Sequence, residues 1–306
     1  MERDYPRLIL GCGNFGGIGS APEAYEKGET LEQAIELMDA AWEAEITRFD
    51  TADAYGGGRS ETYVGEWIRS RRPDGLRITT KTFNPMGVGE DRGLSPARVR
   101  RQIDTSLARL SVERIDLYLA HAWDPDVPVA ETAGVFEELV VAGKIAAYGL
   151  SNVDGGQLRE ALAAGSFAAV QDSYSLLDRE VEDEVLPLCA AHGLWFQVHS
   201  PLMGGWLTGK YRRGAPAPEG SRMTLRPGPY EFLRDDRVYD SLEALESRGD
   251  PATLALAWLL GDERISVVIG PRRPAQLEPA LAALAAPLAP DERQALSAEF
   301  RLVPES

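Results

Sequence analysis

Short segments rich in β-forming residues recur along the whole chain, and amphipathic segments separate them. The expected strands are 7–11, 46–50, 77–81, 115–120, 145–150, 168–172, 194–200 and 266–270. After the third of them, the segment Ser95–Leu110 places Val99, Ile103 and Leu107 on one helical face. These strand–helix units predict a single (β/α)8 TIM barrel domain over residues 1–306, because barrels of this type typically need about 250 residues.

Two of the connections are longer than a barrel of this kind requires. Residues 83–94 follow the third strand, and residues 204–230 follow the seventh. Functional residues of such barrels lie at the carboxyl ends of the strands, so both loops should overhang the functional face. Residues 289–306 predict a C-terminal helical tail, which would either drape over the same rim or pack against the flank of the barrel.

The charge and the cysteine content argue against several classes of protein. Lys and Arg total 32 and Asp and Glu total 48, so the net charge of −16 would repel nucleic acid and anionic membrane surfaces. Cys12 and Cys189 suggest neither a disulfide framework nor a zinc site, and we expect no bound metal. Because no long apolar run or signal peptide is present, the sequence predicts a cytoplasmic protein outside the membrane. No pattern indicates an oligomeric state.

A glycine pattern near the start points to a different fold. Gly11, Gly13 and Gly16 match G-x-G-x-x-G after an apolar segment, which is the pattern of a dinucleotide-binding Rossmann fold. No helical pattern begins at Gly16, however, and the next expected strand ends only at Asp50, later than the acidic residue of that motif should lie. We therefore interpret the glycines as a flexible loop beside the functional face.

Polar side chains stand at the ends of three neighbouring expected strands. Asp50, Lys81 and His121 end the second, third and fourth strands, and Tyr55 follows Asp50 on a glycine-rich turn. Because these strand ends share one face of the barrel, we expect the four side chains to lie together. A lysine ammonium beside a phenol should lower the phenol's pKa from about 10 and make it a usable acid near neutral pH. A histidine in the same pocket could hold a substrate oxygen.

Each of these residues also has an ordinary structural role. Asp–Lys pairs, hydrogen-bonded histidines and half-buried packed tyrosines are common. Asp50 and Asp53 could also form the carboxylate pair of a glycosidase. Lys81 argues against that enzyme class, because a neighbouring ammonium lowers the pKa of the carboxylic acid that must donate a proton. Four such residues at the functional face are harder to explain by packing alone.

Longer stretches of the sequence resemble the aldo-keto reductase family along nearly the whole chain. They are FDTADAYGGGRSE, ITTK, IDLYLAH, GKIAAYGLSNV, VQDSYSLL and SPLMGGWLTGKY. The resemblance implies that the catalytic tetrad is Asp50, Tyr55, Lys81 and His121. In that family a nicotinamide transfers hydride to an aldehyde or ketone, and the tyrosine donates the proton. Asp53 has no counterpart in the tetrad, and we interpret it as a turn or capping residue.

The resemblance also implies residues that hold the nicotinamide. Ser151, Asn152 and Gln171 would hydrogen-bond its carboxamide, although Ser151 and Asn152 could instead cap the following helix. His199 stands where the family usually has a Tyr or Trp that stacks on the nicotinamide ring. The remaining cofactor contacts implied around the seventh loop are Ser200, Leu202, Gly204 and Lys210.

A basic turn after the eighth strand bears on the choice of cofactor. The residues that match the family's turn for the 2′-phosphate are Gly270, Arg272, Arg273 and Gln276. Arginine favours planar, bidentate contacts with phosphate, so we expect NADPH in preference to NADH.

The sequence leaves two questions about the cofactor region undecided: the role of two arginines and the contacts to adenosine. With Lys210, the arginines Arg212 and Arg213 either clasp the pyrophosphate or belong to a solvated charged loop. The family's QLEEN is QLEPA here, so Pro279 and Ala280 replace residues that help to hold adenosine.

Residues of the overhanging loops are the expected substrate contacts, and they suggest a partly aromatic pocket. They are Tyr25, Phe83, Met86, Trp123 and Trp206. Trp123 and Trp206 could instead only wall the barrel rim. A small-molecule carbonyl compound is the expected substrate. The alternative function is a nucleotide-binding regulatory subunit with a vestigial reductase site, since some relatives in the family bind ion channels in that way.

Overall fold

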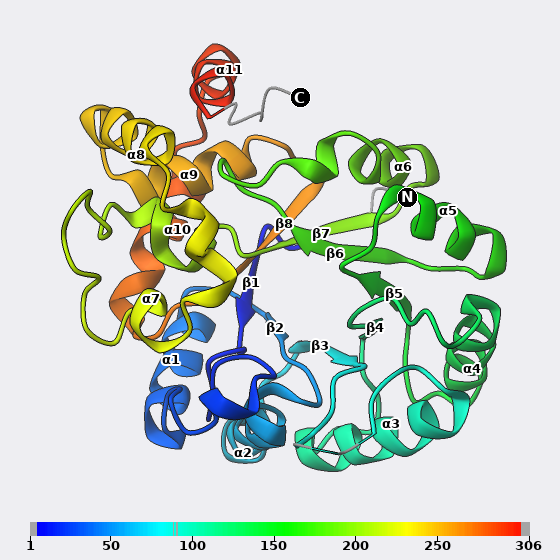
Figure 1. The fold of residues 1–306 in the computed structure, drawn as a ribbon. Coiled ribbons are helices and arrows are strands. Elements are labelled where there is room, and N and C mark those ends of the chain that lie inside the picture. Colours follow the sequence, from blue (N-terminus) through cyan, green and yellow to red (C-terminus); the bar gives the residue numbers. More distant parts are fainter. Residues whose placement is uncertain (1–4, 88, 90, 301–306) are drawn as a thin grey trace.

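Eight parallel strands close into a barrel in the order of the sequence, which confirms the predicted fold class (Figure 1). The computed structural model describes residues 5–87, 89 and 91–300. The strands are β1 (Leu8–Gly11), β2 (Arg48–Asp50), β3 (Arg77–Thr82), β4 (Leu117–Ala120), β5 (Tyr148–Ser151), β6 (Ala169–Ser173), β7 (Trp195–His199) and β8 (Ile265–Ile269). Because β1 pairs with both β2 and β8, the barrel leaves no room for the doubly wound sheet of a Rossmann fold.

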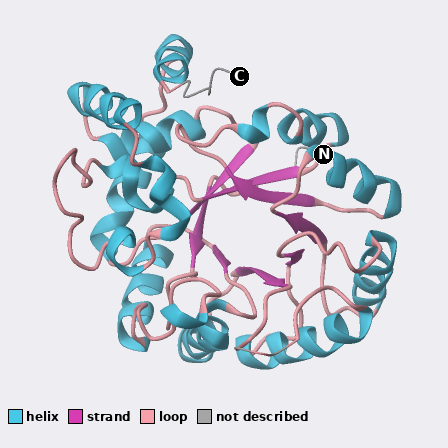
Figure 2. Ribbon diagram, in the orientation of Figure 1, coloured by secondary structure: helices cyan, strands magenta, loops and turns pink. Residues whose placement is uncertain are grey.

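Helices surround the barrel on its outside (Figure 2). The α-helices are α1 (Leu31–Glu43), α2 (Arg59–Arg71), α3 (Pro96–Leu110), α4 (Val129–Val141), α5 (Gly155–Ala164), α6 (Val185–His192), α7 (Arg222–Leu225), α8 (Asp236–Arg248), α9 (Pro251–Leu260), α10 (Glu278–Ala285) and α11 (Pro290–Glu299). Short 3-10 segments are η1 (Pro22–Ala24), η2 (Tyr55–Gly58), η3 (Glu180–Glu182), η4 (Met203–Thr208), η5 (Gly228–Leu233) and η6 (Pro274–Leu277).

Local sequence signals set where several helices begin. Thr30 and Gln33 form a capping box before α1, in which each side chain bonds the other residue's backbone N–H. Asp154 and Gln157 form the same arrangement before α5. Pro96 occupies the first turn of α3, where its missing N–H costs nothing. These caps fix the lengths of the loops that precede the helices.

Apolar side chains pack in two layers. The larger cluster lies between strands and helices and includes Trp67, Ile103 and Phe136. A smaller cluster lies among the strands themselves, where Tyr5 stacks on Trp195 with ring centroids 4.5 Å apart. The small cluster fills the barrel below the polar residues described in the next section, so those residues rest on a packed floor.

The two long loops and the tail are present, and the tail takes one of its two expected positions. The connections after β3 and β7 separate those strands from α3 and α8. In α11, Ser297 accepts a hydrogen bond from Trp258 Nε1 at 2.8 Å, and Glu299 pairs with Arg248 of α8. The tail therefore packs on the flank of the barrel as far as residue 300; residues 301–306 lie outside the described part. Among the described residues, no helix has the length and hydrophobicity to span a membrane.

Replacing either of two helical glycines with alanine should change the free energy of unfolding, but in opposite directions. A Cβ on Gly65 of α2 would lie 1.9 Å from the carbonyl oxygen of Arg109, whereas a Cβ on Gly134 of α4 would meet nothing within 4 Å. We expect Gly65→Ala to lower the free energy of unfolding by about 1–3 kcal/mol through overpacking of α2 against α3. Gly134→Ala should raise it by about 0.5–1 kcal/mol, because alanine is the better helix former. Urea unfolding measures both, and a stabilising Gly65→Ala would contradict the close contact.

Candidate active site

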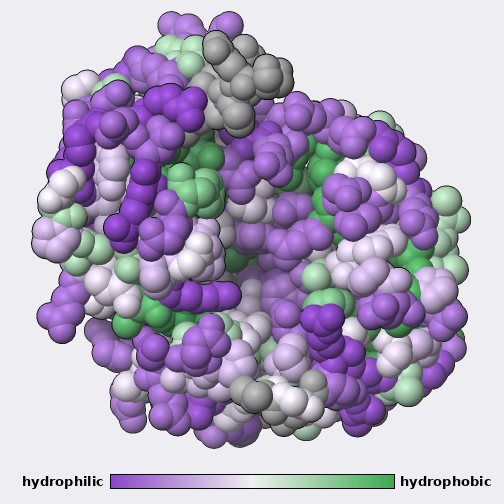
Figure 3. All heavy atoms as spheres, viewed as in Figure 1, coloured by the Kyte–Doolittle hydropathy of each residue, from purple (hydrophilic) through white to green (hydrophobic). Residues whose placement is uncertain are grey.

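Four side chains predicted to act together meet at the carboxyl ends of the strands. Asp50 ends β2, Lys81 is the penultimate residue of β3, His121 follows β4 directly, and Tyr55 begins η2. Figure 3 shows the molecule from the side of Figure 1, with a hollow near its centre and mostly hydrophilic residues around it. The loops thus leave this end of the barrel open to a small molecule.

An ion pair between Lys81 and Asp50 lies at the bottom of the site. Both side chains are almost fully buried, with 1% and 4% of their surface exposed. Lys81 Nζ also donates to the backbone oxygen of Thr51 at 2.9 Å, and Gln171 Nε2 donates to the second oxygen of Asp50 at 2.8 Å. Burial alone would lower the pKa of Lys81, but Asp50 and Tyr55 outweigh it and raise that pKa. The lysine therefore stays charged.

Tyr55 stands between the lysine and the histidine. Its hydroxyl oxygen lies 3.4 Å from His121 Nε2, and Lys81 Nζ lies 5.0 Å from the centre of its ring. Burial raises the pKa of Tyr55, and Lys81 opposes that rise without reversing it. Lys81 therefore acts in the predicted direction, but the net pKa of Tyr55 is raised rather than lowered. Burial outweighs the lysine, and the sequence pattern does not reveal how deeply the phenol is buried. Tyr55 is a protonated phenol at neutral pH.

A left-handed turn holds the phenol in this position. Gly56, Gly57 and Gly58 have φ angles of +59°, +68° and +91°, which side-chain-bearing residues rarely adopt. Gly17 packs so closely here that a Cβ on it would lie 2.7 Å from the Cα of Gly56. The glycines after Tyr55 therefore let the chain reverse within η2 and start α2 immediately behind the site.

His121 is neutral and is contacted from several sides. Burial, followed by the charge of Lys81 and the proximity of His199, holds its pKa well below 6.5. Its Nδ1 lies 3.3 Å from Asn84 Nδ2, and its backbone oxygen accepts a hydrogen bond from Asn152 Nδ2 at 2.8 Å. The sequence analysis did not single out Asn84; its place three residues after Lys81, on an overhanging loop, was the available signal.

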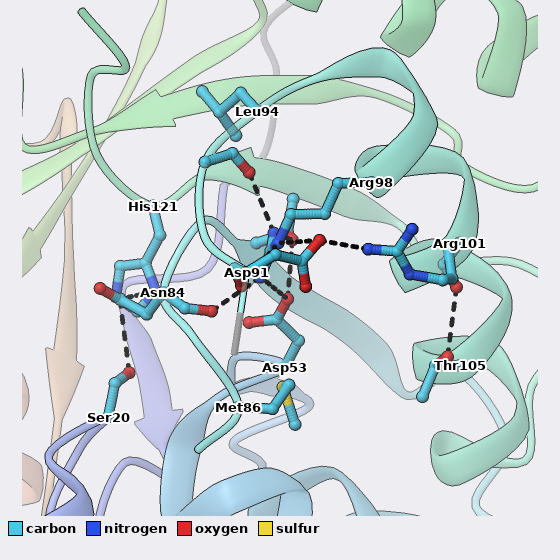
Figure 4. A network of polar contacts seen from close by, with 12 residues as sticks. Ser20, Asp53, Asn84, Met86, Asp91, Leu94, Arg98, Arg101, Thr105 and His121 are labelled. Atoms are coloured by element: carbon cyan, nitrogen blue, oxygen red, sulfur yellow. Dashed lines mark hydrogen bonds and ion pairs between the residues drawn. The ribbon is translucent and has the colours of Figure 1, made fainter. Parts of the chain in front are cut away.

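Asp53 lies in a turn, as one of our two interpretations expected, and its side chain caps neither η2 nor α2. Its side chain is 1% exposed, accepts a hydrogen bond from Thr82 Oγ1 at 2.7 Å and lies 3.7 Å from Arg98 Nη2 (Figure 4). Burial and the nearby Glu61 raise its pKa above the usual range, while Thr82 and Arg98 oppose that rise. Arg98 belongs to α3, 45 positions away (98 − 53), so no local pattern could reveal the contact.

The residues predicted to hold the nicotinamide carboxamide lie at the end of β5, where Ser151 is the last residue and Asn152 follows, and within β6, where Gln171 lies. Asp154, not Ser151 or Asn152, caps α5, so the capping role considered for those two residues is excluded. Asn152 has a left-handed backbone with φ +56°, and its Oδ1 lies 2.9 Å from His199 Nε2. The second ring nitrogen of His199 lies 3.0 Å from Ser200 Oγ. Asn152 thus connects the backbone of His121, directly after β4, to the ring of His199.

Positively charged residues from the seventh loop and the last turn gather at the barrel rim. Burial, followed by the charges of Arg222 and Arg272, lowers the pKa of Lys210. Arg222 Nη2 donates to Asn14 Oδ1 at 2.7 Å. Three cations this close, in a chain of net charge −16, fit the phosphate groups of a dinucleotide. Arg222 is a further residue missed in the sequence, where its place in the basic run of the long loop was the signal.

The two arginines of the last turn have different surroundings. Arg272 pairs with Glu29 and donates to the backbone oxygen of Gly220 at 3.0 Å, while its own N–H donates to Gln276 Oε1 at 2.7 Å. Glu29 is 3% exposed, and burial raises its pKa against the effect of Arg272. Arg273 is exposed, and its guanidinium has no hydrogen bond or ion pair within the described ranges. Arg272 therefore connects three segments, whereas the guanidinium of Arg273 is exposed at the rim.

The other predicted cofactor contacts take ordinary places at the rim. Arg212 and Arg213 are paired with carboxylates of α8, which supports the charged-loop interpretation for both. Ser200 and Gly204 have φ angles of +55° and +61°, and Leu202 is half-buried between them. Gly270, the last contact of this set, is exposed directly after β8. Pro279 and Ala280, which replace the residues that help to hold adenosine in the family, both lie within α10.

The predicted substrate contacts divide into rim and core residues. Phe83 and Trp123 are half-buried beside the site, and Tyr25 donates to the backbone oxygen of Met86 at 3.1 Å. Trp206, however, is 1% exposed and packs against Tyr211 with ring centroids 4.9 Å apart. The structure therefore places Trp206 in the core rather than in a substrate pocket, because the loop folds back on α8 and α9.

Comparisons with known proteins point to one family over nearly the whole chain. A family model described as "Aldo/keto reductase family" matches residues 7–298. The chain is similar to an NADH-specific methylglyoxal reductase of Escherichia coli, at 34% identity over 90% of this chain and 89% of the relative. It is also similar to a putative voltage-gated potassium channel subunit beta of Schizosaccharomyces pombe, at 32% identity over 82% of this chain and 78% of the relative.

Two solved structures share the fold and nearly the full length. A glycerol dehydrogenase from Gluconobacter oxydans has a TM-score of 0.83 and 26% identity, with 98% of this chain and 93% of that chain covered. An aldo-keto reductase from Bacillus halodurans in its holo form has a TM-score of 0.77 and 29% identity, with 96% and 91% covered.

Replacing Arg98 should lower the free energy of unfolding far more than replacing an exposed arginine of the same helix. Arg98→Met leaves the buried Asp53 carboxylate without its cation, so we expect the free energy of unfolding at pH 8 to fall by about 3–5 kcal/mol. Arg100→Met breaks an exposed pair with Glu138 and should change it by less than about 1 kcal/mol. Urea unfolding of both variants compares them. Equal costs would mean that the Asp53–Arg98 pair does not hold the loop after β3.

Proposed function

The chain belongs to the aldo/keto reductase family, whose members use nicotinamide cofactors, and from that premise we propose that it is a cytoplasmic reductase of aldehydes or ketones. The observation that carries the proposal is the convergence of a protonated Tyr55, a charged Lys81 and a neutral His121 at the open end of the barrel. Together these groups can protonate a carbonyl oxygen and polarise it.

The proposed reaction assigns one task to each group. A reduced nicotinamide, when bound, would be the source of the hydride for the carbonyl carbon. Tyr55 donates its phenolic proton to the carbonyl oxygen, which becomes the alcohol. Lys81 lies against the same ring and stabilises the phenolate that remains, and Asp50 keeps the lysine charged and in place. His121 offers a hydrogen bond to the oxygen while it gains negative charge.

Residues around the rim would hold the dinucleotide. Asn152 directly follows β5 and Gln171 lies on the neighbouring strand β6; both carry side-chain amides that suit a carboxamide, and His199 presents a ring beside Asn152. Lys210, Arg222 and Arg273 supply the positive charge that the phosphates require. NADPH is the proposed cofactor, because the exposed guanidinium of Arg273 has no partner among the residues that the structure describes and could contact the 2′-phosphate. The Escherichia coli relative is named as NADH-specific, so the preference needs its own test.

A second function has one observation in its favour. The Schizosaccharomyces pombe relative is named as a channel subunit, so a protein of this fold could bind a nucleotide and act through a partner. The chain of contacts from Asp50 through Lys81 and Tyr55 to His121 favours the enzyme, because a regulatory subunit does not require a proton donor held beside a charged lysine.

Replacement of Tyr55 tests the proposed reaction. Methylglyoxal is the first substrate to use, with loss of NADPH absorbance as the measurement. We expect Tyr55→Phe to lower kcat by about 10²–10⁴-fold, since the proton donor is gone, while NADPH still quenches the tryptophan fluorescence with an unchanged Kd. Tight NADPH binding by the wild-type protein without turnover of any aldehyde or ketone in a panel would instead support the regulatory subunit.

The two arginines of the last turn should differ in their effect on cofactor choice. Arg273→Ala should weaken NADPH binding by about tenfold or more and leave NADH binding unchanged, because one charge-assisted phosphate contact is lost. Arg272→Ala should weaken both cofactors, because it releases Glu29 and Gly220 from the rim. Fluorescence titration with each cofactor measures both effects. Wild-type affinity for NADH equal to that for NADPH would contradict the proposed preference.

A further inference from the structure

Asn84 contacts the site but has no role in the reaction described above. It lies on the loop directly after β3, and Figure 4 shows its side chain between Ser20 and His121. Its amide nitrogen lies 3.3 Å from His121 Nδ1 and 3.4 Å from Ser20 Oγ. The side chain is half-buried and is therefore held among these neighbours rather than in solvent.

The backbone of Asn84 is fixed from behind by α3. Arg98, which is 1% exposed, donates from Nη2 to the backbone oxygen of Asn84 at 2.7 Å and from Nη1 to that of Gly93 at 3.0 Å. The N–H of Gly93 donates in turn to the backbone oxygen of Phe83 at 2.8 Å. The start and the end of the loop are thus tied together around one buried guanidinium, which leaves Asn84 little freedom to move away from the ring.

The contact between Asn84 and His121 determines which nitrogen of the imidazole carries the hydrogen. A neutral imidazole carries one N–H, and its other nitrogen accepts a hydrogen bond. An amide nitrogen can only donate, so His121 Nδ1 must be the acceptor and Nε2 must carry the hydrogen. His121 Nε2 is the nitrogen that lies 3.4 Å from the hydroxyl of Tyr55. The N–H therefore points to where the proposed carbonyl oxygen is protonated.

We propose that Asn84 is a positioning residue that keeps the hydrogen of the neutral His121 on Nε2, where it can bond the carbonyl oxygen of the substrate. The inference rests on the proposed function, since it assigns that oxygen to the space beside Tyr55 and His121. In the opposite tautomer, Nε2 would direct a lone pair at the oxygen as negative charge develops on it, and the interaction would be repulsive.

Two substitutions of Asn84 separate this role from a structural one. Asn84→Asp keeps the size of the side chain but accepts a hydrogen bond, so it should draw the hydrogen to Nδ1. Asn84→Ala removes the contact and imposes neither tautomer. We expect Asn84→Asp to lower kcat for methylglyoxal by about 10²-fold or more, and Asn84→Ala to lower it less. A purely structural side chain would give the reverse order, because aspartate preserves the packing that alanine removes.

The Asn84→Asp enzyme should also differ from the wild-type and Asn84→Ala enzymes in how its kcat depends on pH. The titratable groups that face His121 are Tyr55, Lys81 and His199, and the charged Lys81 disfavours a proton on the ring. A carboxylate at position 84 favours protonation of the ring and so raises its pKa. Below that raised pKa both ring nitrogens carry hydrogen, so the Asn84→Asp enzyme should regain activity as the pH falls towards 5. The wild-type and Asn84→Ala enzymes should show no such recovery.

Nitrogen NMR of protein labelled with ¹⁵N-histidine observes the tautomer directly and does not depend on turnover. The sequence has three histidines, so His121→Gln and His192→Gln variants assign the signals. We expect Nε2–H in the wild-type protein and Nδ1–H in Asn84→Asp at pH 8. Nδ1–H in the wild-type protein, or the same tautomer in both, would overturn the inference. If the wild-type protein reduced no carbonyl compound but showed the expected tautomers, the proposed function would fail while the role of Asn84 in setting the tautomer would stand.

Discussion

The buried ion pair of Lys81 and Asp50 is the interaction on which the site depends. A buried pair is stable only when further hydrogen bonds satisfy both partners, and here Thr51 and Gln171 supply them. These contacts connect β2, β3 and β6 across the mouth of the barrel. Because loss of either charge would leave the other one buried and unpaired, the groups that tune Tyr55 are also groups that hold the strand ends together.

The protonation of Tyr55 follows from a competition between burial and charge. Burial disfavours the phenolate, and the nearby Lys81 ammonium favours it. Burial is the larger effect, so the free site holds a phenol rather than a phenolate, as a proton donor must. The lysine still matters, because it reduces the free energy needed to leave a phenolate behind after the proton has moved. The ammonium of Lys81 therefore stabilises Tyr55 mainly after it has donated its proton, and less before.

The sequence could predict those parts of the structure that depend on neighbours along the chain. The strand pattern located the barrel, and the capping box of Thr30 was visible because its partner is three residues away. The same reasoning missed the buried contact of Asp53 with Arg98 of α3 and the pair of Glu29 with Arg272, because the partners lie far apart in the sequence. Burial was equally hidden, since it depends on the closed fold, and this is why the pKa of Tyr55 was predicted with the wrong sign.

His199 shows how a small ring can be held where a larger one is expected from the family resemblance. Asn152 Oδ1 can only accept a hydrogen bond, so Nε2 of His199 carries the hydrogen and Nδ1 is left to accept one from the Ser200 hydroxyl. Burial, with Lys81 as a second cause, lowers the pKa of His199 to about 4, so the ring adds no positive charge beside the site. A Tyr or Trp would be oriented mainly by its bulk. Two hydrogen bonds orient the imidazole instead, and they make its position depend on Asn152, which also binds the backbone of His121.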